Sequence, residues 1–388
     1  MKKHMALVTL IVVLCGCAIV AFKFMGDSSF KMPEKYKIAI AFTTGRRFAA
    51  ERAKVCFYDK NGDLLKQEKY KATLCDNCIS FEPETGDYNL FTHENVYFSN
   101  GRSIYNDEMD SIYKFASYKG WDDVYESGYM KKWKMFYKHI PHGLSYEHKE
   151  LGYFDILTLY NEHEINNIRV KKSGIMVSDD NETAIYNLVE NGNRIAYEKI
   201  SRKNSKFFIK EGNIDIKGFE KTEGGYYLIN AVWSDNNLYV LMGTGEGENT
   251  DKYILCFEKN GDDIEYKYSS FVNFESMNIS SNCLTSDTVA VDTGKTIEYY
   301  TESFVLGMIS YDKNEHTFEF YPYFQSDKRD IEDITCEVKV IENKVFILIA
   351  DYNANSYTIY QKTQSSELEK ITEIDKSEDL FLADFYVK

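Results

Sequence analysis

The two cysteines whose spacing is best suited to chemistry lie in the stretch Cys75-Asp76-Asn77-Cys78. Cysteines separated by two residues form the redox pair of thioredoxin-like proteins or half of a tetrahedral zinc site. The surrounding sequence does not read as a βαβ unit, and no second ligand pair of zinc-site spacing follows. Structural or free thiols, and a disulfide that involves Cys75 or Cys78, therefore stay open, and redox activity is the least favoured function.

Three histidines crowd the stretch HIPHGLSYEH, at His139, His142 and His148. Pro141 breaks any helix that would align the first two, so we expect ordinary loop histidines. The sequence also has no G-x-S-x-G motif of the serine hydrolase kind. It therefore predicts no catalytic residue, no metal site and no cofactor, although a site assembled from distant segments would leave no local motif.

Two basic stretches stand out in a chain whose net charge is −15. The first contains Lys131, Lys132, Trp133, Lys134 and Lys138, with Trp121 upstream, and the second runs from 199 to 210. Lysines interleaved with aromatic residues suit an anionic polymer, which they hold by charge and by stacking. The alternative, which the sequence favours, is an edge strand that its lysines protect from unwanted pairing.

The overall charge bounds the kind of partner. Nucleic-acid binding depends on Lys and Arg that neutralise phosphates, and 61 acidic residues against 46 basic ones disfavour it. We therefore expect no nucleic-acid partner.

The N-terminus predicts an attachment to a membrane. Lys2 and Lys3 precede an uncharged, apolar run from Met5 to Phe22, which is close to the length of a membrane-spanning helix. The positive-inside rule keeps the lysines in the cytoplasm and places the rest of the chain outside. Within this run, Leu14-Cys15-Gly16-Cys17 resembles a bacterial lipobox, which implies lipidation of Cys17. An uncleaved anchor, a lipoprotein and simple secretion stay open for residues 1–25, and residues 30–388 form one extracytoplasmic body.

An internal repeat indicates the elements that must position any site. The stretch VCFYDKNGDLL at 55–65 returns as ILCFEKNGDDI at 254–264. Asn-Gly between two alternating apolar runs predicts a hairpin with a type I′ turn. Weaker copies carry their marker aromatic at Tyr160, Tyr311 and Tyr360, so the spacing of the markers is one or two units of about 50 residues. Copies are expected near 108 and 207, where SIYNDEMDSIYKF and SRKNSKFFIKEG are the weak candidates.

Several hairpins also have an apolar strand upstream, at 36–42, 238–242 and 345–350. Each unit then has an inner apolar strand, a loop and a hairpin, and this pattern of about four strands per unit resembles β-propellers. The resemblance implies an all-β fold of about seven four-stranded blades after an N-terminal hydrophobic anchor helix. Six or eight blades, or a pair of irregular β-sandwiches, are the alternatives.

These features favour a non-catalytic binding or scaffold module of the cell envelope. It would present one propeller face to an envelope protein or polysaccharide and contact the membrane through its N-terminal segment. The alternative is an extracytoplasmic glycan-processing hydrolase or lyase whose catalytic groups converge from several blades. Whether the protein is an enzyme is left uncertain, with the binding role preferred.

Overall fold

The computed structural model describes most of the body of the chain. The described residues are 35–43, 53–70, 74–82, 88–92, 95–106, 126–140, 154–172, 174–192, 194–216, 225–245, 250–261, 263–285, 287–302, 305–323, 334–341, 343–351, 353–363, 367–375 and 381–388. None of the helices in these ranges is long and apolar enough to cross a membrane. The expected anchor at 1–25, Cys17 and Trp121 lie outside the described residues, so those predictions are untested.

In the described ranges, 28 strands form seven antiparallel sheets of four strands each. Blade 1 contains β28 (Phe381–Val387), β1 (Ile38–Thr43), β2 (Ala53–Tyr58) and β3 (Leu64–Tyr70). Blade 2 contains β4 (Leu74–Phe81), β5 (Tyr88–Thr92), β6 (Asn95–Phe98) and β7 (Ser103–Tyr105). Blade 3 contains β8 (Ser127–Met130), β9 (Met135–Ile140), β10 (Phe154–Tyr160) and β11 (Ile165–Lys171).

The other four blades follow in chain order. Blade 4 contains β12 (Ile175–Ser178), β13 (Ala184–Asn191), β14 (Arg194–Lys203) and β15 (Lys206–Asp215). Blade 5 contains β16 (Tyr226–Ser234), β17 (Asn237–Thr244), β18 (Asp251–Asn260) and β19 (Asp263–Phe271), and the helices α3 (Phe274–Met277) and η1 (Ser281–Cys283) follow it. Blade 6 contains β20 (Val289–Asp292), β21 (Thr296–Tyr300), β22 (Gly307–Asp312) and β23 (Phe318–Pro322). Blade 7 contains β24 (Ile334–Ile341), β25 (Lys344–Asp351), β26 (Ser356–Lys362) and β27 (Leu368–Asp375).

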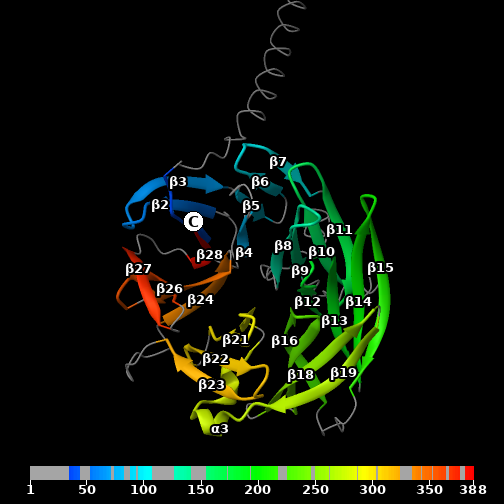
Figure 1. Ribbon diagram of the computed structural model, residues 1–388. Coiled ribbons are helices and arrows are strands. Elements are labelled where there is room, and N and C mark those ends of the chain that lie inside the picture. Colours follow the sequence, from blue (N-terminus) through cyan, green and yellow to red (C-terminus); the bar gives the residue numbers. More distant parts are fainter. Residues whose placement is uncertain are drawn as a thin grey trace, which may run out of the picture.

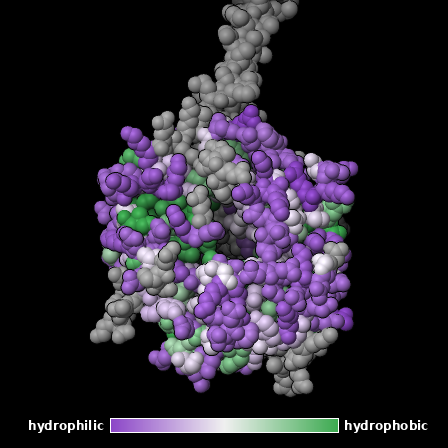
Figure 2. Space-filling view, viewed as in Figure 1, coloured by the Kyte–Doolittle hydropathy of each residue, from purple (hydrophilic) through white to green (hydrophobic). Residues whose placement is uncertain are grey.

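The sheets form a closed ring, in which the first strand of each sheet lies near the axis and the last lies at the rim (Figure 1). Blade 1 closes the ring because it joins the C-terminal strand β28 to the N-terminal strand β1, with Ile40 opposite Phe385. This arrangement confirms the predicted all-β propeller and settles the number of blades at seven. In Figure 2 the face in view is largely hydrophilic and is hollowed near its centre.

The expected order of strands within a blade was wrong at one place. The apolar stretches at 36–42, 238–242 and 345–350 form the second strands β1, β17 and β25, not the innermost ones. A second strand has a strand on each side and a blade on each face, so β17 is buried over almost its whole length. The innermost strand of blade 5, β16, borders the axis and is only partly buried.

The repeat marks the third strand of each blade. The five marker aromatics Tyr58, Tyr160, Phe257, Tyr311 and Tyr360 lie on β2, β10, β18, β22 and β26. The copy expected near 207 is the β14–β15 hairpin, whose turn residues Asn204 and Ser205 both have positive φ. The copy expected near 108 lies earlier instead, where β6 and β7 flank Asn100-Gly101.

The first repeated turn differs from the predicted type. Only Gly62 has a positive φ, of 86°, and the Asp59 carboxylate accepts the backbone N–H groups of Asn61 and Asp63. The pairing of β2 with β3 also shifts by one residue between Phe57 and Tyr58. This is a longer loop with a bulge, which Asn-Gly sequences also form when the flanking strands are out of simple register.

In blades 5, 6 and 7 the repeat also carries a lysine that contacts the preceding blade. Two residues after the marker aromatic, Lys259 of blade 5 reaches Asp179 of blade 4 (3.5 Å), and Lys362 of blade 7 contacts Glu298 of blade 6 (2.7 Å). Lys313 of blade 6 donates to Ser234 of blade 5 and pairs with Asp292 of its own blade. Because the partners of these pairs are largely removed from water, removal of one partner is costly.

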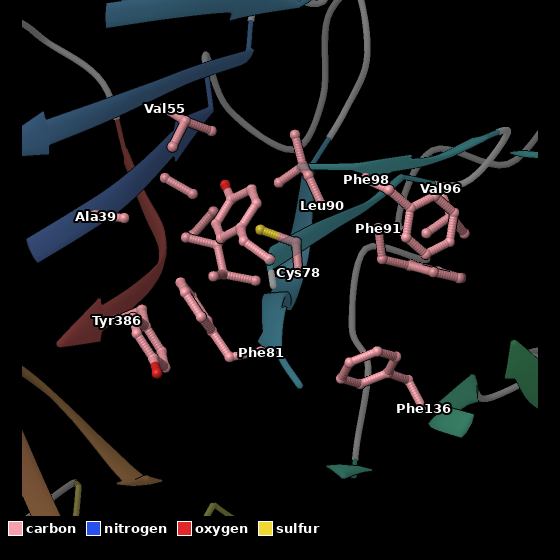
Figure 3. Packing of buried hydrophobic residues seen from close by; sticks show 14 of the residues in the cluster. Ala39, Val55, Cys78, Phe81, Leu90, Phe91, Val96, Phe98, Phe136 and Tyr386 are labelled. Atoms are coloured by element: carbon pink, nitrogen blue, oxygen red, sulfur yellow. The ribbon is translucent and has the colours of Figure 1, made fainter. Parts of the chain in front are cut away.

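A further contact joins three innermost strands where the ring closes. Lys339 of β24 pairs with Asp384 of β28 at 2.6 Å and donates to the carbonyl of Ile79 in β4 at 3.0 Å. The other Asp384 oxygen accepts the backbone N–H of Ile79. Beside this contact, Figure 3 shows Tyr386 facing Phe81 in the apolar cluster between blades 1 and 2. The core consists of such clusters, packed mainly between adjacent blades.

Candidate functional site

The first basic stretch forms the turn between β8 and β9. Backbone bonds from Trp133 N–H to Met130 and from Lys134 N–H to Lys131 close the turn, and Lys134 has a positive φ of 53°. Lys131, Lys132 and Lys134 are exposed, whereas Trp133 is only 7% exposed. The lysines thus occupy a turn, not the protected edge strand of the alternative interpretation, and Trp133 offers no open ring for stacking.

Lys138 lies apart from these three lysines. It is fully buried in β9, and its amino group donates to Ser80 Oγ of blade 2 at 2.8 Å. The structure therefore brings together Lys131, Lys132 and Lys134 but places Lys138 in the contact between blades 2 and 3.

The second basic stretch meets the first one in space. Arg202 of β14 donates to the Trp133 carbonyl at 2.9 Å and to the Glu164 carboxylate at 2.6 Å. Phe207 of β15 packs edge-on against the Trp133 ring, with centroids 5.7 Å apart. The turn of blade 3 and the hairpin end of blade 4 are thus held side by side.

We call the exposed lysines of these two turns the basic turn patch: Lys131, Lys132, Lys134, Lys203 and Lys206. Glu182 lies at its margin, where it accepts the backbone N–H of Lys131. In the described part of the chain, no carboxylate comes within 4 Å of the amino groups of Lys132, Lys134, Lys203 and Lys206. The patch is a local positive surface on an acidic protein.

His139 is not the loop histidine that the sequence suggested, since it lies in β9 and is fully buried. Its Nδ1 lies 2.5 Å from Glu126, and its Nε2 lies 3.3 Å from Asp155. Burial lowers the pKa of the imidazole, but the hydrogen bonds and charges of Asp155 and Glu126 outweigh it and raise that pKa to about 9. His139 is therefore a structural imidazolium near neutral pH. His142 and His148 lie outside the described residues.

The cysteines of the described body are buried. Cys78 lies among apolar side chains of blade 2 (Figure 3), and the side chain of Cys75 is outside the described residues, so a bond between them is untested. Burial raises the pKa of the Cys283 thiol to about 11 and that of Cys336 well above its usual value. These two thiols are consequently poor nucleophiles. No cluster of His, Cys, Asp and Glu suited to a metal ion occurs among the residues that the structure describes.

Sequence reasoning missed Arg202 as the link between the two basic stretches. It also missed the cations of the repeat, although Lys60, Lys259, Lys313 and Lys362 stand at the same place after their marker aromatics. That recurrence was visible in the quoted repeats and could have indicated an inter-blade contact. The pairing of Arg202 with Trp133 joins residues of two blades, and no local pattern announces it.

The four-stranded sheets and their closure define the protein as a seven-bladed β-propeller. No known protein family matches its sequence, and no curated protein matches it. In structure it is similar to a periplasmic gluconolactonase from Pseudomonas aeruginosa (TM-score 0.47, 10% identity, 91% of this chain and 99% of that one). It is also similar to a functionally unknown protein from Desulfotomaculum acetoxidans (0.47, 11%, 89% and 99%) and to apo AztD from Citrobacter koseri (0.42, 11%, 90% and 98%). At these identities and TM-scores the likeness carries nothing about activity.

Proposed function

We propose that this propeller is a non-catalytic binding module of the cell envelope, tethered to a membrane by residues 1–25, and that its basic turn patch holds an anionic polymer. The observation that carries the proposal is the convergence of two basic turns from neighbouring blades. Arg202 holds them together through Trp133 and Glu164. The tether rests on the apolar N-terminal run and its preceding lysines.

The charge distribution supports an anionic ligand. On a chain of net charge −15, most anions are repelled, so a local group of five exposed lysines is the place where one can dock. Exposed amino groups separated by one turn each contribute modestly, and their effects add along a polymer that contacts several at once. A polymer therefore suits the patch better than a single small anion.

The burial of Trp133 determines how the polymer is held. Because its ring packs against Phe207 and is 7% exposed, it cannot stack on a sugar ring. Recognition then depends on charge, and binding should weaken steeply as salt rises. This distinguishes the patch from a lectin site built on aromatic platforms.

The test is retention of the full chain, kept in a nonionic detergent, on immobilised polyphosphate and on immobilised polygalacturonate. The variant Lys131→Ser/Lys132→Ser/Lys134→Ser should lose most retention on at least one polymer at low salt. The matched control Lys35→Ser/Lys60→Ser/Lys344→Ser changes the net charge equally at exposed positions elsewhere and should keep it. Equal loss of retention in both variants would show that net charge, and not the basic turn patch, determines binding. Shortening of the polymer during incubation would replace the binding role with that of a hydrolase or lyase.

A further inference from the structure

A buried lysine in blade 5 pairs with no carboxylate among the described residues. Lys252 of β18 is 3% exposed, and its amino group donates to the hydroxyl of Tyr227 in β16 and to Thr250 Oγ1 at 2.5 Å. The ammonium also lies over the Tyr227 ring, 4.7 Å from its centroid. Among the residues that the structure describes, no carboxylate pairs with Lys252. By contrast, the inter-blade lysines Lys362 and Lys339 each have one.

The hydrogen bonds of this cluster leave donors unused. The ammonium has three hydrogens, of which the two hydroxyls accept two. The hydroxyls of Tyr227 and Thr250 lie 2.8 Å apart, so one of them donates to the other. One ammonium hydrogen and one hydroxyl hydrogen remain. A buried positive charge with two spare donors is unfavourable unless an anionic acceptor completes it.

The sheet register assembles the cluster. Tyr227 lies directly opposite Gly243 of β17, and Gly243 lies opposite Lys252, so the three point to the same face of the blade. A Cβ on Gly243 would lie 2.4 Å from Cζ of Tyr227. The glycine therefore makes the space in which the Tyr227 ring crosses the sheet and brings its hydroxyl to Lys252.

Tyr227 connects the cluster to the surface of blade 5, since 37% of this residue is exposed. The segment after β19 lies against β18, where the Val272 N–H donates to the Lys252 carbonyl. Burial raises the pKa of the Cys283 thiol in η1, and the nearby charge of Lys252 lowers it. The cluster thus lies at the end of blade 5, beside the segment that follows β19.

The Lys252 cluster lies far from the basic turn patch in the fold. Lys252 and Tyr227 lie where the innermost strand of a blade begins, whereas the patch lies on the turn where an innermost strand ends. Innermost strands of a propeller run in the same direction around the ring, so the two sites lie on opposite faces. The two can be tested separately.

We propose that Lys252, Tyr227 and Thr250 form a binding site for a small oxyanion, a carboxylate or phosphate group. The oxyanion accepts the free ammonium hydrogen and the free hydroxyl hydrogen. It neutralises Lys252 and accepts from whichever of the Tyr227 and Thr250 hydroxyls does not donate to the other. No covalent step is involved.

The test measures thermal unfolding of the full chain in nonionic detergent with millimolar sodium phosphate, sodium acetate or sodium chloride at matched ionic strength. We expect at least one oxyanion to raise the melting temperature saturably above the chloride value, and the comparison of phosphate with acetate tells which group the site takes. Lys252→Met should abolish this increment, and in chloride it should melt no lower than the unchanged protein, because an uncompensated buried charge has been removed. Lys370→Met, at an exposed lysine of blade 7, serves as the control and should keep the increment.

Tyr227→Phe gives a second readout that does not depend on how well Lys252→Met folds. It keeps the ring and removes one hydroxyl of the cluster, so the concentration of oxyanion at half-effect should shift by roughly tenfold. A protein that responds to neither oxyanion beyond chloride overturns the proposal. An increment that persists in Lys252→Met overturns it as well, and so does an unchanged half-effect concentration in Tyr227→Phe.

Discussion

Replacing Lys362 by methionine tests whether the cations of the repeat hold the blades together. Lys362 is the last residue of β26 in blade 7, and its amino group contacts both oxygens of Glu298 in blade 6, at 2.7 and 2.8 Å. The lysine side chain is 14% exposed and the glutamate 8%. Lys362→Met keeps most of the apolar stem and leaves the carboxylate buried, with the Tyr300 hydroxyl as its one remaining hydrogen-bond partner among the described residues.

The size of the effect follows from this burial. Removal of one partner from a buried ion pair typically costs 3–5 kcal/mol, and the retained Tyr300 bond places Lys362→Met near the lower end, at about 3 kcal/mol. Unfolding entropy is about 2.1 cal/mol/K per residue, so a body of roughly 350 residues has an unfolding entropy near 0.7 kcal/mol/K. The melting temperature should therefore fall by about 4 °C.

The assay is differential scanning calorimetry at constant pH, with Lys370→Met as the matched control. Lys370 pairs with Glu373, but both side chains are about half exposed, so its loss should lower the melting temperature by less than about 1 °C. Adding Glu298→Gln to Lys362→Met should recover part of the loss, since the buried charge is then gone. A fall for Lys362→Met no larger than that of the control would refute the argument that these pairs set the blade contacts.

Three further results are expected. His139→Gln should be less stable than the unchanged protein at pH 6, by on the order of 3 kcal/mol. Because folding raises the pKa of His139 from 6.5 to about 9, this difference in stability should shrink as pH rises from about 6.5 through 9. Urea unfolding at several pH values measures the difference. Lys339→Met should destabilise ring closure by about 3 kcal/mol, since Asp384 stays buried, and hydrogen exchange should rise first in β28 and β4. Cys283 and Cys336 should react with a thiol reagent at pH 8 only after denaturant is added, and rapid reaction in the native protein would contradict their raised pKa values.

The repeat could be predicted because its signals are local. Asn-Gly turns and alternating strands act over about ten residues, so the markers at Tyr58, Phe257 and Tyr311 identify the third strands of their blades. The innermost strand of blade 5 was missed because β16 and β17 are both mostly apolar in sequence, and only the fold shows that β16 is partly buried and β17 almost fully buried. The turn type at Asp59 was missed because strand register, which the sequence does not display, selects the loop geometry.

The site depends more on contacts that are distant in sequence. The basic stretches at 130–139 and 199–210 were visible as composition, but their meeting is made by Arg202 and Trp133, which are 69 residues apart. In the same way Lys138 looked like a member of the first stretch, and the alternation of β9 directs it to Ser80 of the preceding blade. Sequence spacing therefore predicted the charge of the surface but not which lysines share it.

The contrast between Lys252 and the buried lysines that pair with a carboxylate, Lys339 and Lys362, carries the strongest inference from the fold. Each of these two pairs with a carboxylate of another blade and so joins two blades. Lys252 joins no blade through a carboxylate and instead contacts hydroxyls of its own blade, so a structural role does not account for its burial. A methionine there would pack without leaving an uncompensated charge. A negative group would offset the charge of Lys252, and an oxyanion is a group that its spare donors fit.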